Sequence, residues 1–511
     1  MKHKARALSL LMALAMAVSM FAACGDGSGD PGTTGTDTGS TGGDKPKEVV
    51  TLKWWHWGDP PKNPDKVIEA LNAKSAEDIG VKIDFIWATG DDAKLKTALS
   101  TGADDDIAFT CSWFANYITT AQKGQLYDIT EMLEREEYSE LRDFIPDWVW
   151  EGANIQGRLY AVPTFKDVAS TNYWYCNKEY VFDQAGAEEE FMTPGNRNAV
   201  KTPLLKKLYD YMKEGHPYPH DLTAPYTYNF QGPRSPATDM LTGIDAPLSI
   251  TEGDDTYTLV FSCTTPNFRA DLKTLCEWYQ AGYCNQDCLQ LQKEPEFIIV
   301  NQAQGWEGAE KSVWGLNKDY TVAICQRGDT VATPVAALGS MQGIFANSKH
   351  PEEALKFIEY MNLDVDYRNM LGYGIEGENW EDNGDGTVNR LNSDWEPGLF
   401  AQGTFFTLKP VAPAPADMYD KLKIQMENAK TSPLLGFTPD YTNCKTEQAA
   451  VASTWEKYKY EAACGTMKDP DAFIDKVEKE LNQVGLDVVK KEMQAQIDAL
   501  LKSKGIDVPA R

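Results

Sequence analysis

The feature of this chain that most limits its possible folds is a regular alternation of strand-like and helix-like segments near its start. Short apolar segments predict strands at 51–57, 81–87 and 107–110, and segments with apolar residues at helical spacing predict helices at 64–76 and 91–100. Strands that alternate with helices form parallel βαβ units. The sequence therefore predicts an α/β protein.

Two tryptophans stand where these strands end. Trp57 is the last residue of the first predicted strand, and Trp113 comes shortly after the third. Ligands of open α/β sheets bind outside the carboxyl ends of the strands. Both tryptophans are therefore candidates for ligand contact, although packing beneath the helices would explain them equally well.

The rest of the chain continues the mixture of strands and helices. Extended segments are predicted at 157–163 and 172–175. Helices are predicted at 178–186, 201–215, 269–282, 351–362, 471–484 and 487–502. No internal repeat is visible. The length of the body, 49–511, suits two or three domains.

The first residues have the order of charge and hydrophobicity of a secretory signal. A cationic start at 2–6 precedes an apolar run at 7–23, and Cys24 follows two alanines. This order resembles a lipobox, in which the cysteine is acylated and becomes the mature N-terminus, although Phe21 departs from the usual aliphatic residue. We expect residues 1–23 to be removed and Cys24 to be lipidated, with ordinary secretion as the alternative.

The segment 24–48 is predicted to be a flexible tether. It is rich in Gly, Ser, Thr and Asp and has almost nothing to bury, so ordering it would not be offset by hydrophobic burial. A spacer in a cell wall would have the same composition. Either reading places the protein outside the cytoplasm, and the lipid anchor would attach it to the cell membrane.

Charge and cysteine content restrict the partners. The net charge of −27 argues against binding to nucleic acid or to the surface of anionic lipid. Nine cysteines remain besides Cys24, an odd number, so at least one must stay free or pair between chains. The sequence leaves disulfide pairing and buried free thiols as open alternatives.

Several motifs occur in the order found in family 1 extracellular solute-binding proteins. They are Trp-Trp-His-Trp-Gly at 54–58, Gly-Gln-Leu-Tyr-Asp-Ile-Thr at 124–130 and Gly-Arg-Leu-Tyr-Ala-Val-Pro at 157–163. The segment 175–178 resembles the Tyr-Asn-Lys of the family's crossover strand, with Cys176 inserted. The resemblance covers nearly the whole body.

Segments nearer the C-terminus resemble a narrower branch of the family. Segments 347–354 and 372–377, then 436–437 and 447–500, are similar to LplA-like lipoproteins with a C-terminal helical extension. The branch and its parent family have the same general fold.

The resemblance implies a two-lobe periplasmic-binding-protein-like (type 2) fold with crossover strands and a helical C-terminal extension. Lobe 1 would comprise 49–168 and 333–395, and lobe 2 would comprise 169–332 and 396–511. It further implies a monomer that captures a carbohydrate, most commonly an oligosaccharide, in the cleft between the lobes and delivers it to an ABC import permease. Such a protein needs no cofactor or metal and is not an enzyme.

The ligand-binding residues expected on this basis begin with the aromatic ones. Aromatic faces match the C–H patches of sugars, while carboxylates and amides bind the hydroxyls. We expect Trp57 to be a stacking platform, with Asp59 as a hydroxyl acceptor, and Trp113 to lie at the edge of the cleft. The other candidates are Tyr173, Trp174, Trp306, Tyr373 and Glu376. Core packing, or a structural turn at 372–377, is the competing explanation.

Other chemistries are less well supported by the residues. His216 and His220 have a metal-like spacing, but the intervening prolines exclude the helix that would align them. The segment 381–386 is similar to a calcium loop, yet Asn392 stands where such loops have a bidentate glutamate. A peptide- or amine-binding protein of the same fold, and a secreted glycan-active enzyme with paired carboxylates, remain the alternatives.

Overall fold

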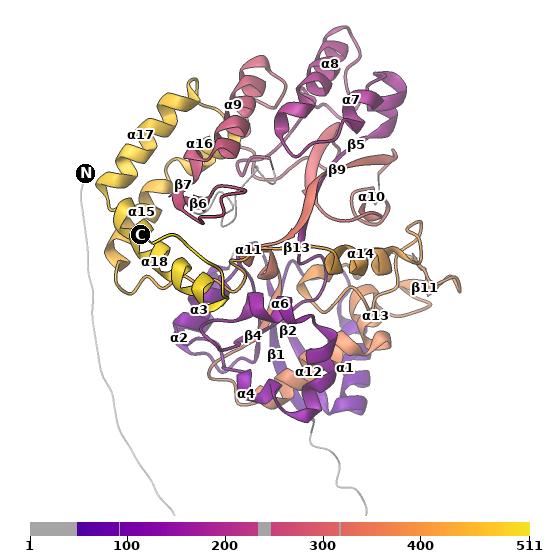
Figure 1. Ribbon diagram of the computed structural model, residues 1–511. Helices are drawn as coiled ribbons and strands as arrows, with labels where there is room; N and C mark the ends of the chain where they lie inside the picture. The colour runs from indigo at the N-terminus through magenta and orange to yellow at the C-terminus, as the bar shows by residue number, and fades with distance from the viewer. Residues whose placement is uncertain (1–48, 91, 234–246, 316–317, 511) are drawn as a thin grey trace, which may run out of the picture. The chain divides into compact units, whose positions relative to one another are not determined.

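The computed structural model describes residues 49–90, 92–233, 247–315 and 318–510. They contain two larger sheets, of five and four strands, with helices around them (Figure 1). The predicted signal peptide, Cys24 and the tether fall outside the described residues. Within them, no helix combines the length and the apolar character that crossing a membrane requires.

The strands and helices have the following bounds. The strands are β1 (Val50–Trp57), β2 (Val81–Ala88), β3 (Ile107–Thr110), β4 (Ala161–Pro163), β5 (Ser170–Asn177), β6 (Leu248–Ile250), β7 (Leu259–Phe261), β8 (Val300–Gln304), β9 (Val322–Ala332), β10 (Met341–Ile344), β11 (Trp380–Asp382), β12 (Val388–Arg390) and β13 (Lys430–Thr431). The α-helices are α1 (Asp65–Ile79), α2 (Ala93–Thr101), α3 (Tyr117–Gln122), α4 (Thr130–Leu133), α5 (Ser139–Phe144), α6 (Asp147–Ala153), α7 (Glu188–Met192), α8 (Thr202–Lys213), α9 (Pro266–Ala281), α10 (Ala309–Ser312), α11 (Pro334–Ala337), α12 (Pro351–Leu363), α13 (Val365–Tyr373), α14 (Met418–Glu427), α15 (Lys445–Trp455), α16 (Lys459–Cys464), α17 (Pro470–Gln483) and α18 (Leu486–Ser503). Short 3-10 or π segments are Glu136–Tyr138, Glu179–Gln184, Asn198–Lys201, Ser262–Thr264 and Leu399–Ala401.

The first sheet has the strand order β2-β1-β3-β10-β4. β1 runs parallel to both β2 and β3, as the alternating pattern predicts, whereas β10 is antiparallel to β3 and β4. β10 follows β3 in the sheet although about 230 residues separate them in the sequence, so it can only be placed by tertiary structure. In Figure 1 the helices α1 and α12 lie beside this sheet.

Alternation along β1 decides which of its aromatic residues enter the core. Leu52, Trp54 and His56 are buried, while Trp55 and Trp57 on the opposite face keep partial exposure. The Trp54 indole N–H donates to the Gln342 side-chain oxygen of β10 at 3.0 Å, which satisfies its polar atom inside the core. Trp57 is thereby directed to the face that the site occupies.

The second sheet has the order β13-β9-β5-β8. β5 lies between β8 and β9 and is antiparallel to both. One face of β5 places Trp174 and Cys176 in a hydrophobic cluster with Trp278 of α9 and Leu205 of α8. The helices α8 and α9 therefore determine which face of β5 is the core face.

The C-terminal helices form their own hydrophobic cluster with α9 and the hairpin of β6 and β7. Buried residues of α17 and α18, such as Leu481 and Ile497, lie in the same cluster as Phe261 and Phe268. The carboxylate of Asp471 at the start of α17 pairs with Arg269 of α9 at 2.9 Å. The C-terminal extension is therefore an integral part of the core.

The segment 399–426 packs with the first sheet. Phe405, Met418 and Leu422 lie in the same hydrophobic cluster as Trp54. The division of the chain into lobe 1 (49–168 and 333–395) and lobe 2 (169–332 and 396–511) stays a prediction.

The nine cysteines of the described residues are all buried and free. The sequence left disulfide pairing and buried free thiols as alternatives, and these nine cysteines are buried free thiols. Burial raises the pKa of Cys111 and of Cys276 to about 12, so both thiols remain protonated near neutral pH.

Candidate functional site

Three aromatic rings from distant parts of the chain meet at the end of the first sheet. The ring centroids of Trp57 and Trp113 are 5.8 Å apart with an interplanar angle of 88°. Phe400 lies 4.7 Å from Trp57 and 6.1 Å from Trp113. We call these three residues the aromatic platform. The two tryptophans that the sequence placed at strand ends are thus in contact with each other.

Parallel pairing brings the two tryptophans together. Trp57 ends β1, and the chain leaving the neighbouring strand β3 reaches Trp113 within three residues. The Trp113 indole N–H donates to the carbonyl of Gly339 at 3.1 Å, which fixes the ring on the segment before β10. The turn that carries Trp113 is tight, because Ala115 has φ +40°. The Ala115 N–H donates to the carboxylate of Asp92 at 2.8 Å, which stabilises this turn.

Exposure distinguishes the platform from the core beside it. Trp113 is 52% exposed, whereas the neighbouring ring of Phe109 is fully buried. Trp57 is half-buried, and Gly398 faces its ring so closely that an added Cβ would lie 3.1 Å from it. The platform therefore exposes the indole of Trp113 to solvent, while the rings of Trp57 and Phe400 are partly buried.

A second group of aromatic rings lies on β5. Tyr175 stacks on Trp314 with a centroid distance of 4.9 Å and an interplanar angle of 13°, and Tyr173 lies 5.9 Å from the same indole. Burial raises the pKa of Tyr173 to about 12, and the carboxylates of Glu307 and Glu310 act in the same direction. Its hydroxyl therefore remains a neutral hydrogen-bond group at physiological pH.

Besides Tyr173, which is 5% exposed, three more of the predicted ligand residues are buried in the structure. Trp174 has no exposed surface and packs between Tyr226 and Trp278. Trp306 is 7% exposed, and the nearest aromatic ring is that of Phe405. Neither indole offers a free face in this conformation.

Tyr373 is the third of these buried candidates. It has no exposed surface, and its hydroxyl donates to the Lys409 carbonyl at 2.7 Å. The glycines around it form the end of α13, where Gly374 (φ +90°) and Gly377 (φ +78°) adopt backbone conformations that favour glycine. The turn, which was the competing explanation for this motif, accounts for these residues.

The two carboxylates among the predicted ligand residues are exposed. Asp59 follows Gly58, whose φ of +111° turns the chain out of β1, and it stands two residues after Trp57. Glu376 lies in the exposed turn after α13. Asp59 is thus the polar candidate that lies nearest to the platform along the chain.

Local sequence patterns do not indicate several residues that complete the two aromatic groups or link the two sheets. Neither Phe400 nor Trp314 lies in a recognised motif. Lys166 and Asp167, just after β4, form a largely buried ion pair at 2.6 Å. The Gln304 side chain at the end of β8 donates to the backbone carbonyl of Asp167 at 2.9 Å, which links the two sheets near the point where the chain passes between them.

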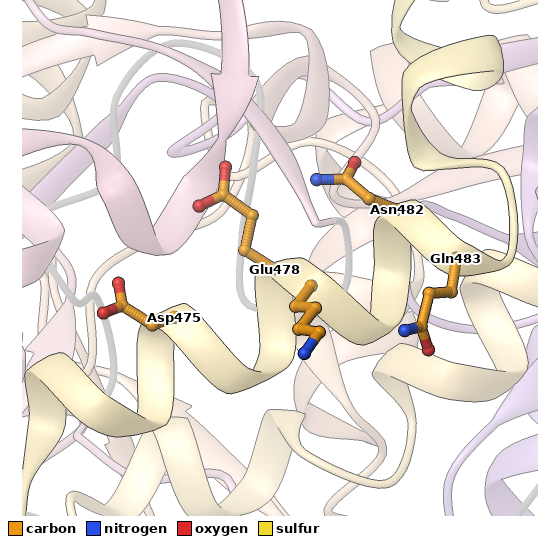
Figure 2. A pocket seen from close by; sticks show the side chains of 5 residues that line it. Asp475, Glu478, Asn482 and Gln483 are labelled. Atoms are coloured by element: carbon orange, nitrogen blue, oxygen red, sulfur yellow. The ribbon is translucent and has the colours of Figure 1, made fainter.

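One open pocket of about 560 Å³ lies elsewhere, along α17 (Figure 2). It is lined by Asp475, Glu478, Lys479, Asn482 and Gln483. All five side chains project from a single helix, and none of them is aromatic. This surface therefore differs in chemistry from the predicted aromatic site.

Comparison with known proteins relates nearly the whole chain to transport proteins. The chain is 27% identical over 510 residues to a carbohydrate ABC transporter substrate-binding protein of Streptococcus pneumoniae, covering 95% of this chain and 96% of the relative. Residues 433–502 match a family described as a domain of unknown function (DUF3502), which corresponds to the C-terminal extension.

Solved structures agree with this relationship. The N-glycan transport solute-binding protein NgtS of S. pneumoniae matches with a TM-score of 0.78 and 26% identity, covering 89% of this chain and all of that protein. Its complex with Man5GlcNAc matches with a TM-score of 0.75 and 26% identity, covering 90% of this chain and all of that protein. The alginate-binding protein AlgQ2, at 14% identity and a TM-score of 0.58 over 89% of this chain and 99% of its own, shares the fold. The predicted α/β, two-lobe periplasmic-binding-protein-like fold and the resemblance to extracellular solute-binding proteins are thereby confirmed along nearly the whole chain.

Proposed function

We propose that this protein captures a carbohydrate outside the cytoplasm and delivers it to an ABC import permease. The relative from S. pneumoniae is a carbohydrate transporter's substrate-binding protein, and the matched NgtS structures include complexes with Man1GlcNAc and Man5GlcNAc. An oligosaccharide with several hexose rings, of the N-glycan type, is the ligand class that we propose. The protein acts as a carrier and does not convert its ligand.

The observation in this chain that carries the proposal is the half-exposed face of Trp113 beside Trp57 and Phe400. A sugar ring presents a flat patch of C–H groups that an indole face matches, and it is surrounded by hydroxyls that need polar partners. The aromatic platform supplies the first requirement, and Asp59 is our candidate for the second. Tyr175 and Trp314, both partly exposed, form a second aromatic surface for a longer glycan, and the buried Tyr173 packs beside Trp314.

Attachment to the membrane belongs to the same proposal and rests on the sequence alone. Acylation of Cys24 would anchor the protein in the outer face of the cell membrane, and the tether 25–48 would let the body reach the permease. A single copy of the chain is sufficient for this role, so we propose a monomer.

A binding experiment tests the proposal directly. The purified chain would be titrated by calorimetry with Man5GlcNAc, with mannose, and with short peptides as the alternative ligand class. We expect Man5GlcNAc to bind and to raise the free energy of unfolding by about 2.7 kcal/mol at 100 times its Kd. Chromatography of the glycan afterwards should return it unchanged.

The other outcomes identify the alternative functions. Binding of peptides without any glycan would favour the peptide- or amine-binding alternative. Shortened glycan products would mean that the protein is an enzyme.

A further inference from the structure

Arg368, in α13, is completely buried and directs its guanidinium at a single irregular segment of the chain. Its four hydrogen bonds all go to neutral oxygen atoms of residues 399–404. Nε donates to the Thr404 carbonyl at 2.8 Å, Nη1 to the Gln402 side-chain oxygen at 2.8 Å, and Nη2 to the carbonyls of Leu399 and Gly403 at 3.1 Å each.

Burying a cation in this way is costly, because it loses its hydration and gains no carboxylate in these four bonds. Burial accordingly lowers the pKa of Arg368 to about 10. The segment that accepts the bonds contains one short 3-10 turn, Leu399–Ala401, and no strand, so side chains bond the carbonyls that a ladder would otherwise pair. The arginine therefore supplies the donors that a strand or helix would otherwise provide.

The same segment carries the third ring of the aromatic platform. Phe400 contacts both Trp57 and Trp113, while Gly398 abuts the Trp57 ring. Gln342 of β10 holds the segment as well, because its side-chain amide donates to the Ala401 carbonyl at 2.8 Å. The Phe400 carbonyl accepts from the Ser340 hydroxyl, while Arg368 and Gln342 hold the residues on either side of Phe400.

We propose that Arg368 is a positioning residue for ligand binding: it holds the segment 398–404 so that Phe400 fixes the orientation of Trp57 and Trp113. This inference rests on the proposed carbohydrate function of the platform. If the guanidinium is removed, the segment loses four hydrogen bonds at once, and Phe400, still bonded through its carbonyl to the Ser340 hydroxyl, constrains the two indoles less tightly.

The first test does not require any glycan. In the full chain, Arg368→Met keeps an unbranched apolar stem but removes the guanidinium and with it every donor. We expect hydrogen exchange of the amides at 399–404 to become at least tenfold faster, since each factor of ten corresponds to about 1.4 kcal/mol of lost local stability. Unchanged exchange at these amides would overturn the proposal whether or not the protein binds glycans.

The second test measures affinity with a matched control. Arg327, on β9, is another buried arginine, which donates to the Gln302 side chain at 3.1 Å and pairs with Asp271 at 3.5 Å. We expect Arg368→Met to weaken Man5GlcNAc binding about tenfold. Arg327→Met should lower the melting temperature but leave Kd within about twofold. Equal losses of affinity in the two variants would mean that general destabilisation explains the result.

A double-mutant cycle separates action through Phe400 from other routes. Phe400→Ala alone should weaken glycan binding, and adding Arg368→Met to it should produce little further loss, because the ring that the arginine positions is already gone. Fully additive losses would contradict the proposal. If Arg368→Met fails to fold, Gln342→Met removes the second anchor of the same segment, and it should likewise accelerate exchange at 399–404 and weaken binding.

Different results would show that the carbohydrate function is wrong and that the positioning role of Arg368 is wrong. If the wild-type chain binds no glycan, the carbohydrate function is wrong, whereas the exchange measurement still decides whether Arg368 orders the segment. If the wild type binds and Phe400→Ala weakens binding while Arg368→Met does not, the function stands and the positioning role is wrong.

Discussion

Trp113 and Trp174 illustrate how two residues of the same type can have opposite roles in one fold. Trp113 is 52% exposed at the end of the first sheet, whereas Trp174 is fully buried on the core face of β5. We expect Trp113→Ala to weaken glycan binding roughly tenfold, about 1.4 kcal/mol, with little loss of stability. Trp174→Ala should instead lower the free energy of unfolding by about 3–5 kcal/mol and leave Kd nearly unchanged. Urea denaturation and calorimetry on both variants measure the two effects, and the reverse pattern would contradict the assignment.

His56 makes the stability of the protein depend on pH. Complete burial lowers the pKa of His56 to about 3, and the charge of Arg368 acts in the same direction. The unfolded imidazole, with a pKa of about 6.5, binds a proton between pH 6.5 and 3 that the folded one does not. The free energy of unfolding should therefore fall as the pH decreases from 6.5, by up to about 2 kcal/mol at pH 5.

Substitution isolates this contribution. Between pH 7 and pH 5, the free energy of unfolding of His56→Leu, measured by urea denaturation, should fall by about 2 kcal/mol less than that of the wild type. His216→Leu removes an exposed histidine and serves as the control. An identical pH profile for wild type and His56→Leu would exclude His56 as the source.

At the residue scale, the sequence predicted the position of two platform rings but not the third. Trp57 and Trp113 follow neighbouring parallel strands, so a general property of α/β sheets places them together. Phe400 joins them from more than 280 residues further along the chain and lies in a segment without a periodic pattern. Side-chain hydrogen bonds from Arg368, Gln342 and Ser340 hold it there, and sequence periodicity carries no information about such contacts.

At the scale of secondary-structure elements, the start of α17 offers a direct test. The Asp469 carboxylate accepts the Ala472 N–H at 3.0 Å as the N-cap, and Pro470 occupies the first helical position. Asp469→Ala should lower the free energy of unfolding by about 1 kcal/mol. Asp469→Asn should lower it much less, because asparagine is also a good N-cap. Asp417 at the start of α14 makes no such bond, so Asp417→Ala should change the stability by less than about 0.5 kcal/mol in the same urea experiment.

Predicted boundaries match the observed ones where the local signal is strong, in strands such as β3 as well as in helices. The helix predicted at 471–484 is α17, Pro470–Gln483, because an amphipathic period and a proline at its start are local signals. The strand predicted at 157–163 is reduced to β4, Ala161–Pro163. Gln156 and Gly157 have positive φ angles and form a tight turn, which the apolar pattern does not reveal.

At the scale of the whole molecule, the reactivity of the cysteine thiols tests the folding of the core, and their number after denaturation tests the lipidation of Cys24. All nine cysteines of the described residues are buried, and the burial that raises the pKa of Cys284 to about 12 also excludes reagents. We expect a thiol reagent to react only very slowly with the native protein. In denaturant the protein purified from membranes should show nine reactive thiols if Cys24 is acylated and ten if it is not.

The controls for this measurement are simple. Cys24→Ser should leave the count at nine and release the protein from the membrane. Rapid reaction of the native protein would mean that the cysteine-containing core opens readily. Fewer than nine thiols after denaturation without reductant would indicate disulfides.

The way Arg368 holds the segment 398–404 has a consequence for how the protein can evolve. Three of its four acceptors are backbone carbonyls, which are present whatever side chains the segment carries. Position 400 can therefore acquire a different side chain by mutation while the path of the chain around it is preserved. Descendants of this protein could change the ring that faces Trp57 and Trp113 through substitutions in one short loop, without first having to acquire a new fold.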